Sequence, residues 1–195
     1  MKYFKFLIVL YIQSGICFGD TDLTGEIAPK WALKSSDGDY IFLNDYVAPS
    51  GEDLRGDKKK QRSVIVQTFF ASWCGNCIEE IKELHNIKRS FEEKNIDFFV
   101  IDLTEYTRRS KDPKHRQAKN GSDYLDDLGL NKIPVLMDDD GITAMSYGFD
   151  IELGSRLPRL LVIDKYQKVR FDKTGACSKC FDDELIPLLQ ELIKE

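Results

Sequence analysis

Apolar runs alternate with polar, turn-rich segments along the chain, and their spacing predicts the central elements. Residues 64–70 are almost continuously apolar, as expected for a strand that is covered on both faces. Apolar positions then recur every three or four residues, which predicts a helix with one buried face. These positions are Ile78, Ile81, Leu84, Ile87 and Phe91. Residues 96–103 form the next apolar run, so we expect a strand-helix-strand unit with parallel strands.

Turn signals organise the flanking segments. Asp37-Gly38 lies between two short apolar runs, which predicts a hairpin over residues 31–43. A second hairpin is expected over residues 159–171. The shorter predicted elements are a helix over 122–128 capped by Ser122, a strand over 134–137, a helical segment over 142–147 and a last helix over 181–193, in which Pro187 marks a kink or the start of the main part.

Two stretches are predicted to be exposed. Residues 48–63 are polar and turn-rich, and residues 105–120 are highly charged. We interpret the first as a surface connection and the second as an insertion. The order of elements fits an α/β fold, a thioredoxin-like three-layer sandwich with an N-terminal hairpin extension and an inserted charged loop or helix.

Composition adds limits on function. The chain has 195 residues, of which 42% are hydrophobic, and its net charge is −5. A globular domain is therefore expected. We expect no nucleic-acid partner, because proteins bind nucleic acid through a basic surface.

The first 19 residues resemble a secretory signal peptide. Lys2 and Lys5 precede the apolar run 6–12, and Cys17-Phe18-Gly19 suits a cleavage site. A retained anchor is the alternative, but the run is shorter than the roughly 20 residues that span a bilayer. We expect residues 20–195 to form a single exported, periplasmic domain without stable membrane insertion, with a net charge of −7 after loss of these two lysines.

Every cysteine outside the leader belongs to a C-x-x-C pair. The pairs are Cys74-Gly75-Asn76-Cys77 and Cys177-Ser178-Lys179-Cys180. A bridge across two residues closes a very short loop, so such pairs are more often redox-active or metal-binding than structural.

The first pair lies where the central strand meets the helix. Unpaired N–H groups and the positive end of the helix dipole favour a thiolate there, which lowers the pKa of the first cysteine. We expect Cys74 to be the exposed nucleophile and Cys77 the resolving thiol. An inert bridge or one arm of a zinc site is the alternative.

The segments 25–46, 64–84 and 134–164 resemble the TlpA/ResA-type branch of exported bacterial thioredoxin-like proteins. The resemblance rests mainly on W-C-G-N-C-I-E-E, with Glu80, and on the later R-L-P-R. It implies a thiol-disulfide oxidoreductase that acts on exported proteins and a redox donor or acceptor protein, with no cofactor and no metal. Asn76 and Lys82 replace prolines common in this branch, so the direction of electron flow stays open.

The resemblance also implies site residues. Pro158 would be a cis-proline facing the cysteine pair, and the backbone of Leu157 would pair with an extended substrate beside Trp73, Gly75 and Asn76. Without the resemblance, an ordinary trans-proline is the simpler interpretation.

Glu80 follows Cys77 by three residues on the predicted helix, so both lie on nearly the same face. If that face is buried, desolvation raises the carboxyl pKa and suits Glu80 to proton exchange with Cys77. The alternative is a solvated acid beside Glu79 and Glu83. Thr68 occupies the position at which cytoplasmic thioredoxins have a buried aspartate. Threonine has no carboxylate, so Thr68 cannot take the role of that aspartate.

Three roles are open for Cys177 and Cys180. They are a redox relay with the first pair, a local disulfide that stiffens the start of the last helix, and a shared metal site of four cysteines. The last role defines the alternative function, a module that binds or delivers copper or zinc.

Overall fold

A computed structural model describes residues 21–56, 61–150, 156–177 and 179–195. The predicted signal peptide lies outside these residues. Within them, seven strands form one sheet in the order β2-β1-β5-β4-β3-β6-β7. This mixed sheet with helices on its faces confirms the thioredoxin-like fold.

The centre of the sheet is the predicted strand-helix-strand unit. Every residue of β3 (Val64–Phe70) is buried, and β3 pairs in parallel with β4 (Ile96–Asp102). The connecting helix α1 (Gly75–Ser90) and its C-cap Phe91 bury the apolar positions identified from their spacing. Because the sheet is covered on both faces at this point, its central strand has no solvent-exposed side.

The second hairpin continues the sheet beyond β3. Strand β6 (Arg159–Ile163) pairs antiparallel with β3, and β7 (Val169–Thr174) pairs antiparallel with β6. Strand β7 therefore runs parallel to β3, so the chain leaves both strands at the same edge of the sheet. It then continues into η2 (Phe181–Leu185) and α6 (Ile186–Leu192), with Pro187 in the first turn of α6.

The N-terminal hairpin extends the other side of the sheet. Strands β1 (Ala32–Ser35) and β2 (Tyr40–Phe42) pair antiparallel, and β1 joins the short strand β5 (Val135–Met137). The 3-10 turn η1 (Leu43–Asp45) follows β2. The predicted surface connection after it is partly wrong, because Ala48 and Leu54 are buried.

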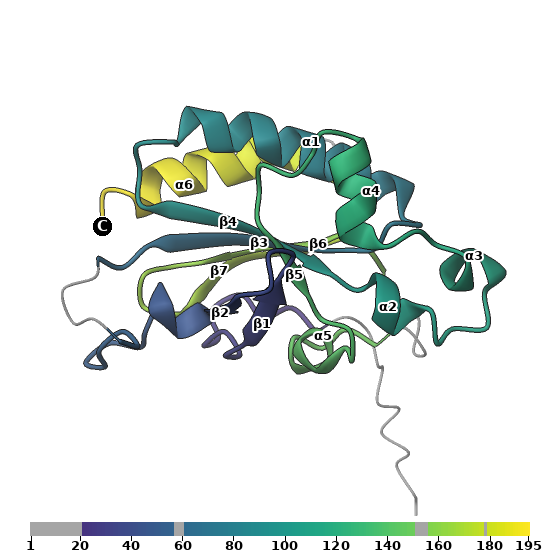
Figure 1. Ribbon diagram of the computed structural model, residues 1–195. Coiled ribbons are helices and arrows are strands. Elements are labelled where there is room, and N and C mark those ends of the chain that lie inside the picture. The colour runs from purple at the N-terminus through teal and green to yellow at the C-terminus, as the bar shows by residue number, and fades with distance from the viewer. Residues whose placement is uncertain (1–20, 57–60, 151–155, 178) are drawn as a thin grey trace, which may run out of the picture.

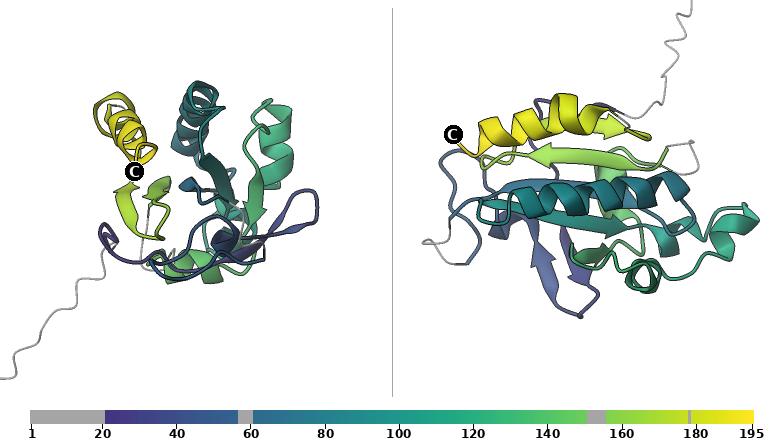
Figure 2. Two further views of the ribbon diagram at one scale, coloured as in Figure 1. Left: turned by 90° about the vertical axis from the view of Figure 1, so that its left-hand side faces the viewer. Right: turned by 90° about the horizontal axis from the view of Figure 1, so that it is seen from above.

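Helices form layers on both faces of the sheet. Helices α1, α6 and α4 (Gly121–Asp127) cover one face, and α5 (Ile142–Ser146) lies on the other (Figures 1 and 2). Each face has its own cluster of buried apolar side chains. No helix in the described part of the chain is long and apolar enough to cross a membrane.

The charged insertion forms two short helices at one end of the molecule (Figure 1). They are α2 (Thr104–Thr107) and α3 (Pro113–Arg116). The prediction of full exposure is wrong for Tyr106 and Thr107, which are buried. The predicted Ser122 cap of the next helix is also wrong, since Asn120 caps α4 by accepting a hydrogen bond from the Asp123 N–H at 3.2 Å.

Candidate active site

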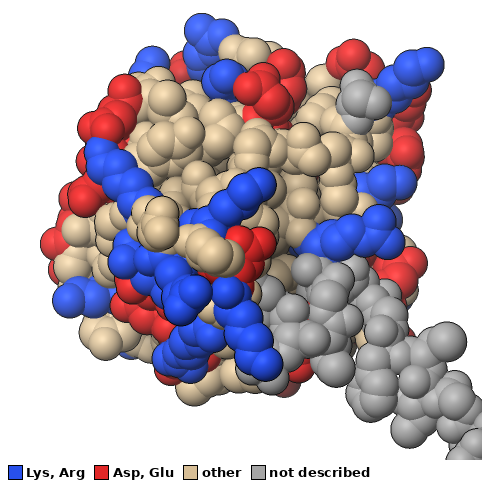
Figure 3. Space-filling view, turned by 90° about the vertical axis from the view of Figure 1, so that its right-hand side faces the viewer, with Lys and Arg blue, Asp and Glu red and all other residues tan. Residues whose placement is uncertain are grey.

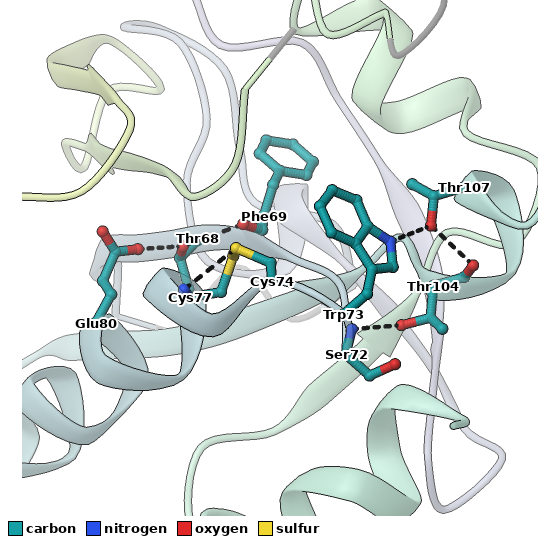
Figure 4. The surroundings of a disulfide bond; sticks show 9 residues. All are labelled: Thr68, Phe69, Ser72, Trp73, Cys74, Cys77, Glu80, Thr104 and Thr107. Atoms are coloured by element: carbon teal, nitrogen blue, oxygen red, sulfur yellow. Dashed lines mark hydrogen bonds between the residues drawn. A yellow bond between two sulfur atoms is a disulfide. The ribbon is translucent and has the colours of Figure 1, made fainter. Parts of the chain in front are cut away.

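Cys74 occupies the N-cap position of α1, on the short connection that follows the buried strand β3. Its Sγ accepts a hydrogen bond from the backbone N–H of Cys77 at 3.2 Å, and the two cysteines form a disulfide with Cα atoms 5.3 Å apart (Figure 4). The same N–H also donates to the carbonyl oxygen of Cys74 at 3.1 Å, so the sulfur shares this donor at the first turn of the helix, where side-chain oxygens usually act as caps. The same contact would stabilise negative charge on Cys74 when the disulfide is reduced.

The prediction that Cys74 is exposed is only partly right, because both cysteines of the pair are buried. Cys74 is 6% exposed and Cys77 is fully buried, so Cys74 is the accessible member but is not widely exposed. Gly75 and Asn76 between them are exposed, and Trp73 is half-buried. A partner therefore has to approach Cys74 through the surface that these three residues form.

Glu80 is buried one helical turn after Cys77, so it is not a solvated surface acid. It is 4% exposed, and Thr68 Oγ1 on β3 donates a 2.5 Å hydrogen bond to its Oε1 (Figure 4). Burial raises the pKa of Glu80 from its ordinary value of 4.5 to about 7, and the Thr68 hydrogen bond opposes this rise. Its Oε2 has no partner among the described residues. This carboxyl can therefore take up and release a proton near neutral pH.

A groove of about 560 Å³ connects Glu80 with the surface. It runs between α1 and the segment that begins the C-terminal helix, and it is lined by Asn76, Glu79, Glu83 and Cys177 among others. Water in such a groove could exchange protons with Glu80 while Cys74 and Cys77 stay buried.

Trp73 connects the motif with the insertion. Its Nε1 donates a 2.8 Å hydrogen bond to Thr107 Oγ1 on α2, and its ring stacks on His115 of α3 with the centroids 3.9 Å apart. Ser72 Oγ donates a 2.5 Å hydrogen bond to the carbonyl of Lys119. The insertion is thus held against the cysteine motif.

A buried carboxylate, Asp102, is linked through Thr104 to the segment that precedes the cysteine motif. Asp102 Oδ1, at the end of β4, accepts hydrogen bonds from the N–H and Oγ1 of Thr104, and Thr104 Oγ1 accepts one from the N–H of Ser72. Burial raises the pKa of Asp102 to about 6. Gly121 starts α4 so close to Asp102 that a side chain on it would collide with the carboxylate.

Sequence reasoning missed the polar residues that surround the motif. The sequence indicates Thr68 only as the replacement of an aspartate, it places Thr107 and His115 in an exposed insertion, and it predicts no role for Thr104. Asp102 followed by Thr104 at the end of an apolar strand was an available signal, because Asp at such a position commonly accepts hydrogen bonds from the following turn.

The peptide bond between Leu157 and Pro158 is cis, as the resemblance implied. Arg159 directly follows and pairs with Phe69 of β3, so Pro158 lies at the edge of the sheet where β3 ends. The carbonyl of Pro158 accepts a 2.7 Å hydrogen bond from the N–H of Gly175. The chain after β7 is therefore fixed beside this proline.

Cys177 and Cys180 lie at the same edge, because β7 runs parallel to β3 and ends just before them. They form a disulfide with Cα atoms 5.6 Å apart. Cys180 is 6% exposed within the core cluster, and Cys177 is half-buried on the groove described above. Among the described residues, no group of three or more His, Cys, Asp or Glu is placed to hold a metal ion.

The edge that carries these residues also carries basic side chains. Figure 3 looks onto it and shows Lys and Arg side chains gathered in its lower half, over the insertion. Residues 104–120 contain six Lys and Arg against two acids, although the whole chain has a net charge of −5.

Several solved structures share this architecture. A protein from Chlorobium tepidum assigned as thiol:disulfide interchange protein DsbE is 21% identical, with a TM-score of 0.61 over 86% of this chain and 95% of that one. A protein from Bacteroides thetaiotaomicron assigned as a disulfide isomerase is 19% identical, with a TM-score of 0.64 over 88% and 91%. The exposed lipoprotein thioredoxin of Streptococcus pneumoniae is 21% identical, with a TM-score of 0.57 over 84% and 100%. At these identities the similarity establishes the fold.

Fold and site together define the class of protein. A thioredoxin-like sheet with a disulfide-forming C-x-x-C pair at the start of the helix after its central strand is that of a thiol-disulfide oxidoreductase. The chain belongs to the Redoxin family, whose sequence profile matches residues 35–184. No curated protein matches the sequence.

Proposed function

We propose that this protein exchanges disulfides with exported proteins through Cys74. The observation that carries the proposal is the Cys74 Sγ at the N-cap of a 16-residue helix, 3.2 Å from the N–H of Cys77. A thiolate at this position gains a hydrogen bond and the favourable end of the helix dipole. It is therefore a nucleophile at neutral pH.

The reaction follows from the burial of the two cysteines. The Cys74 thiolate attacks one sulfur of a partner's disulfide, forms a mixed disulfide and releases the other sulfur as a thiolate. The Cys77 thiol then loses its proton and attacks Cys74 Sγ, which releases the second partner thiol. Two electrons pass to the partner, and Cys74 and Cys77 become the disulfide. The same steps in reverse oxidise a partner.

We assign the proton of Cys77 to Glu80. The carboxyl lies one helical turn further along α1, and its pKa of about 7 leaves both protonation states populated at neutral pH. The carboxylate form accepts the proton as Cys77 becomes the attacking group. Thr68 holds the carboxyl in place and keeps its pKa from rising further.

The partner's chain would lie across the edge of the sheet beside Cys74. Leu157 and Pro158 would contact an extended segment through the backbone, while Trp73, Gly75 and Asn76 form the surface around the sulfur. The position of Pro158 at the end of β3 supports this assignment.

We further propose that residues 1–19 direct export and are removed after Gly19, which places the mature domain in the periplasm. The basic start and short apolar run of this segment support the proposal. Fractionation of cells that express the full chain, followed by N-terminal sequencing, tests it. A mature protein beginning at Asp20 is expected, and an uncleaved chain in the cytoplasm would contradict the proposal.

Trapping tests the assignment of the nucleophile. With Cys77 replaced by Ser, the mixed disulfide between Cys74 and a disulfide-containing protein should accumulate, because the resolving thiol is absent. The matched variant Cys74→Ser should form no such adduct. Equal trapping in both variants would rule out Cys74 as the attacking residue.

Alkylation tests the thiolate itself. In the reduced protein, iodoacetamide at pH 7 should label Cys74 faster than a cysteine in an unstructured peptide, since the thiolate is the reactive form. Labelling no faster than in the peptide would contradict the helix-terminus argument.

A further inference from the structure

The insertion is basic while the rest of the molecule is acidic. Residues 104–120 carry a net charge of +4 in a chain of −5, which leaves −9 on all other residues. An excess of one sign on one segment of an oppositely charged protein creates a local field that can select partners.

Part of this charge is used within the fold. Arg108 forms a 3.2 Å ion pair with Glu105 and donates a hydrogen bond to the carbonyl of Ala118 at 2.7 Å. Lys119 forms an ion pair with Asp127. These two cations stabilise the insertion and are not available to a partner.

The remaining charge on α3 and just before it faces solvent. Lys111, Lys114 and Arg116 are exposed and form no ion pair with any described residue. The acid between them, Asp112, caps α3 by accepting a 2.8 Å hydrogen bond from the Lys114 N–H. We refer to Lys111, Lys114 and Arg116 as the basic surface.

The basic surface is fixed close to the reactive cysteine. Lys114 and Arg116 flank His115, whose ring stacks on Trp73, and Trp73 precedes Cys74 in the chain. The hydrogen bond from Trp73 to Thr107 holds the same segment from α2. A partner whose sulfur reaches Cys74 therefore brings its neighbouring residues to the side of the motif that carries these cations, whose field is screened over about 10 Å at 0.1 M salt.

The opposite side of the motif carries the other sign. The groove along α1 is lined by Glu79, Glu83 and Asp182. Charge is thus unevenly distributed along the active-site edge. Cations are in excess on the side of the insertion, although Asp140 and Asp150 line a pocket with Lys111, and anions line the groove beside the C-terminal helix.

We propose that the basic surface docks protein partners that carry Asp or Glu residues next to the cysteines exchanged with Cys74. This inference rests on the proposed function, because it concerns the partner of the same reaction. A protein is favoured over nucleic acid because the other charges of the molecule repel a long polyanion. The expected effect is on association, as complementary charges raise encounter rates about 10-fold to 1,000-fold at low salt.

Two matched disulfide peptides test the proposal, one with three Glu and one with three Lys beside the same cystine. The reduced protein should react at least about tenfold faster with the Glu peptide at low ionic strength. The difference should disappear when the ionic strength rises from about 0.02 M to about 0.5 M, because salt screens exposed charges.

Charge-reversal variants test whether the preference for the Glu peptide depends on the basic surface. The variant Lys111→Glu/Lys114→Glu/Arg116→Glu should reverse the preference between the peptides. The control variant Lys94→Glu/Lys168→Glu/Lys194→Glu makes the same change in net charge at exposed positions near the opposite end of the strands and helices, and it should keep the original preference. Equal rates for both peptides, or the same response in both variants, would overturn the proposal.

A small uncharged disulfide separates this inference from the proposed function. Reduction of 2-hydroxyethyl disulfide should proceed equally in all forms. If this reduction proceeds but the protein does not distinguish the peptides, the docking proposal alone fails. If this reduction is absent, the proposed function fails.

Vesicles containing phosphatidylglycerol test a lipid surface as the alternative partner. If the protein binds these vesicles through the basic surface but reacts equally with both peptides, the proposal of a protein partner is wrong and the basic surface binds lipid instead.

Discussion

Thr68 Oγ1 donates a 2.5 Å hydrogen bond to Oε1 of Glu80, joining the central strand β3 to the helix α1 beneath the cysteine pair. Both residues are buried, so the carboxyl of Glu80 is shielded from solvent. Among the described residues, Thr68 donates a hydrogen bond to one of its oxygens and the other oxygen has no partner. The pair supplies a group with a pKa of about 7 one helical turn after Cys77, whose thiol loses a proton in the proposed reaction. Two of our predictions concern this contact.

Glu80→Gln should change how stability depends on pH. The pKa of Glu80 is about 7 in the folded protein and near 4.5 when unfolded, so its ionisation opposes folding as pH rises between these values. As pH rises across this range, the free energy of unfolding of the wild-type protein should fall by up to about 3 kcal/mol relative to that of the variant. Urea unfolding of both proteins from pH 4 to pH 8 measures the difference. A constant difference across the range would show that the carboxyl titrates normally.

Thr68→Val should raise the pKa of Glu80 above 7, because it removes the hydrogen bond that lowers this pKa. Thr68→Ser keeps the hydroxyl and should leave the pKa almost unchanged. NMR titration of the Glu80 side chain in the three proteins is the measurement. A lower pKa in the Val variant would mean that Thr68 does not stabilise the charged form.

Asp172→Leu should strongly destabilise the protein, because it leaves the buried guanidinium of Arg159 without its counter-charge. The two side chains are 1% and 2% exposed and joined at 2.6 Å and 2.9 Å. Breaking a buried pair on one side costs about 3–5 kcal/mol.

Urea unfolding measures this loss, with two comparisons. The double variant Arg159→Met/Asp172→Leu should recover much of the stability, because no charge is left buried. Glu79→Ala removes the exposed pair with Lys82 and should cost less than about 1 kcal/mol. A loss for Asp172→Leu as small as that for Glu79→Ala would contradict the structural importance of the buried pair.

Replacing Cys177 and Cys180 together by Ser tests whether the second pair is structural. We expect a loss of no more than about 2 kcal/mol in stability, since the bridge closes a short loop. The rate of exchange at Cys74 should stay the same if the disulfide only stiffens the start of the C-terminal helix. A slowed turnover of protein disulfides, with an unchanged reaction of Cys74 with small disulfides, would support the relay instead.

The order of elements was predictable from the sequence because hydrophobic spacing reports local structure directly. The continuous apolar run of β3 and the helical spacing of α1 needed only their own residues, and both were confirmed. The insertion was predicted less well. Its charges predict an exposed loop or helix, while Tyr106 and Thr107 are buried by contacts with residues far away in the chain.

By itself, the sequence determined the class of fold, the position of Cys74 at the start of a helix and the unequal distribution of charge, since these depend on spacing and composition. Only the tertiary structure decided that Thr68 faces Glu80, that Trp73 stacks on His115 and that Arg159 pairs with Asp172. Each of these contacts joins different secondary-structure elements. Their energies depend on distance and burial in the folded state, and neither quantity is encoded by local periodicity.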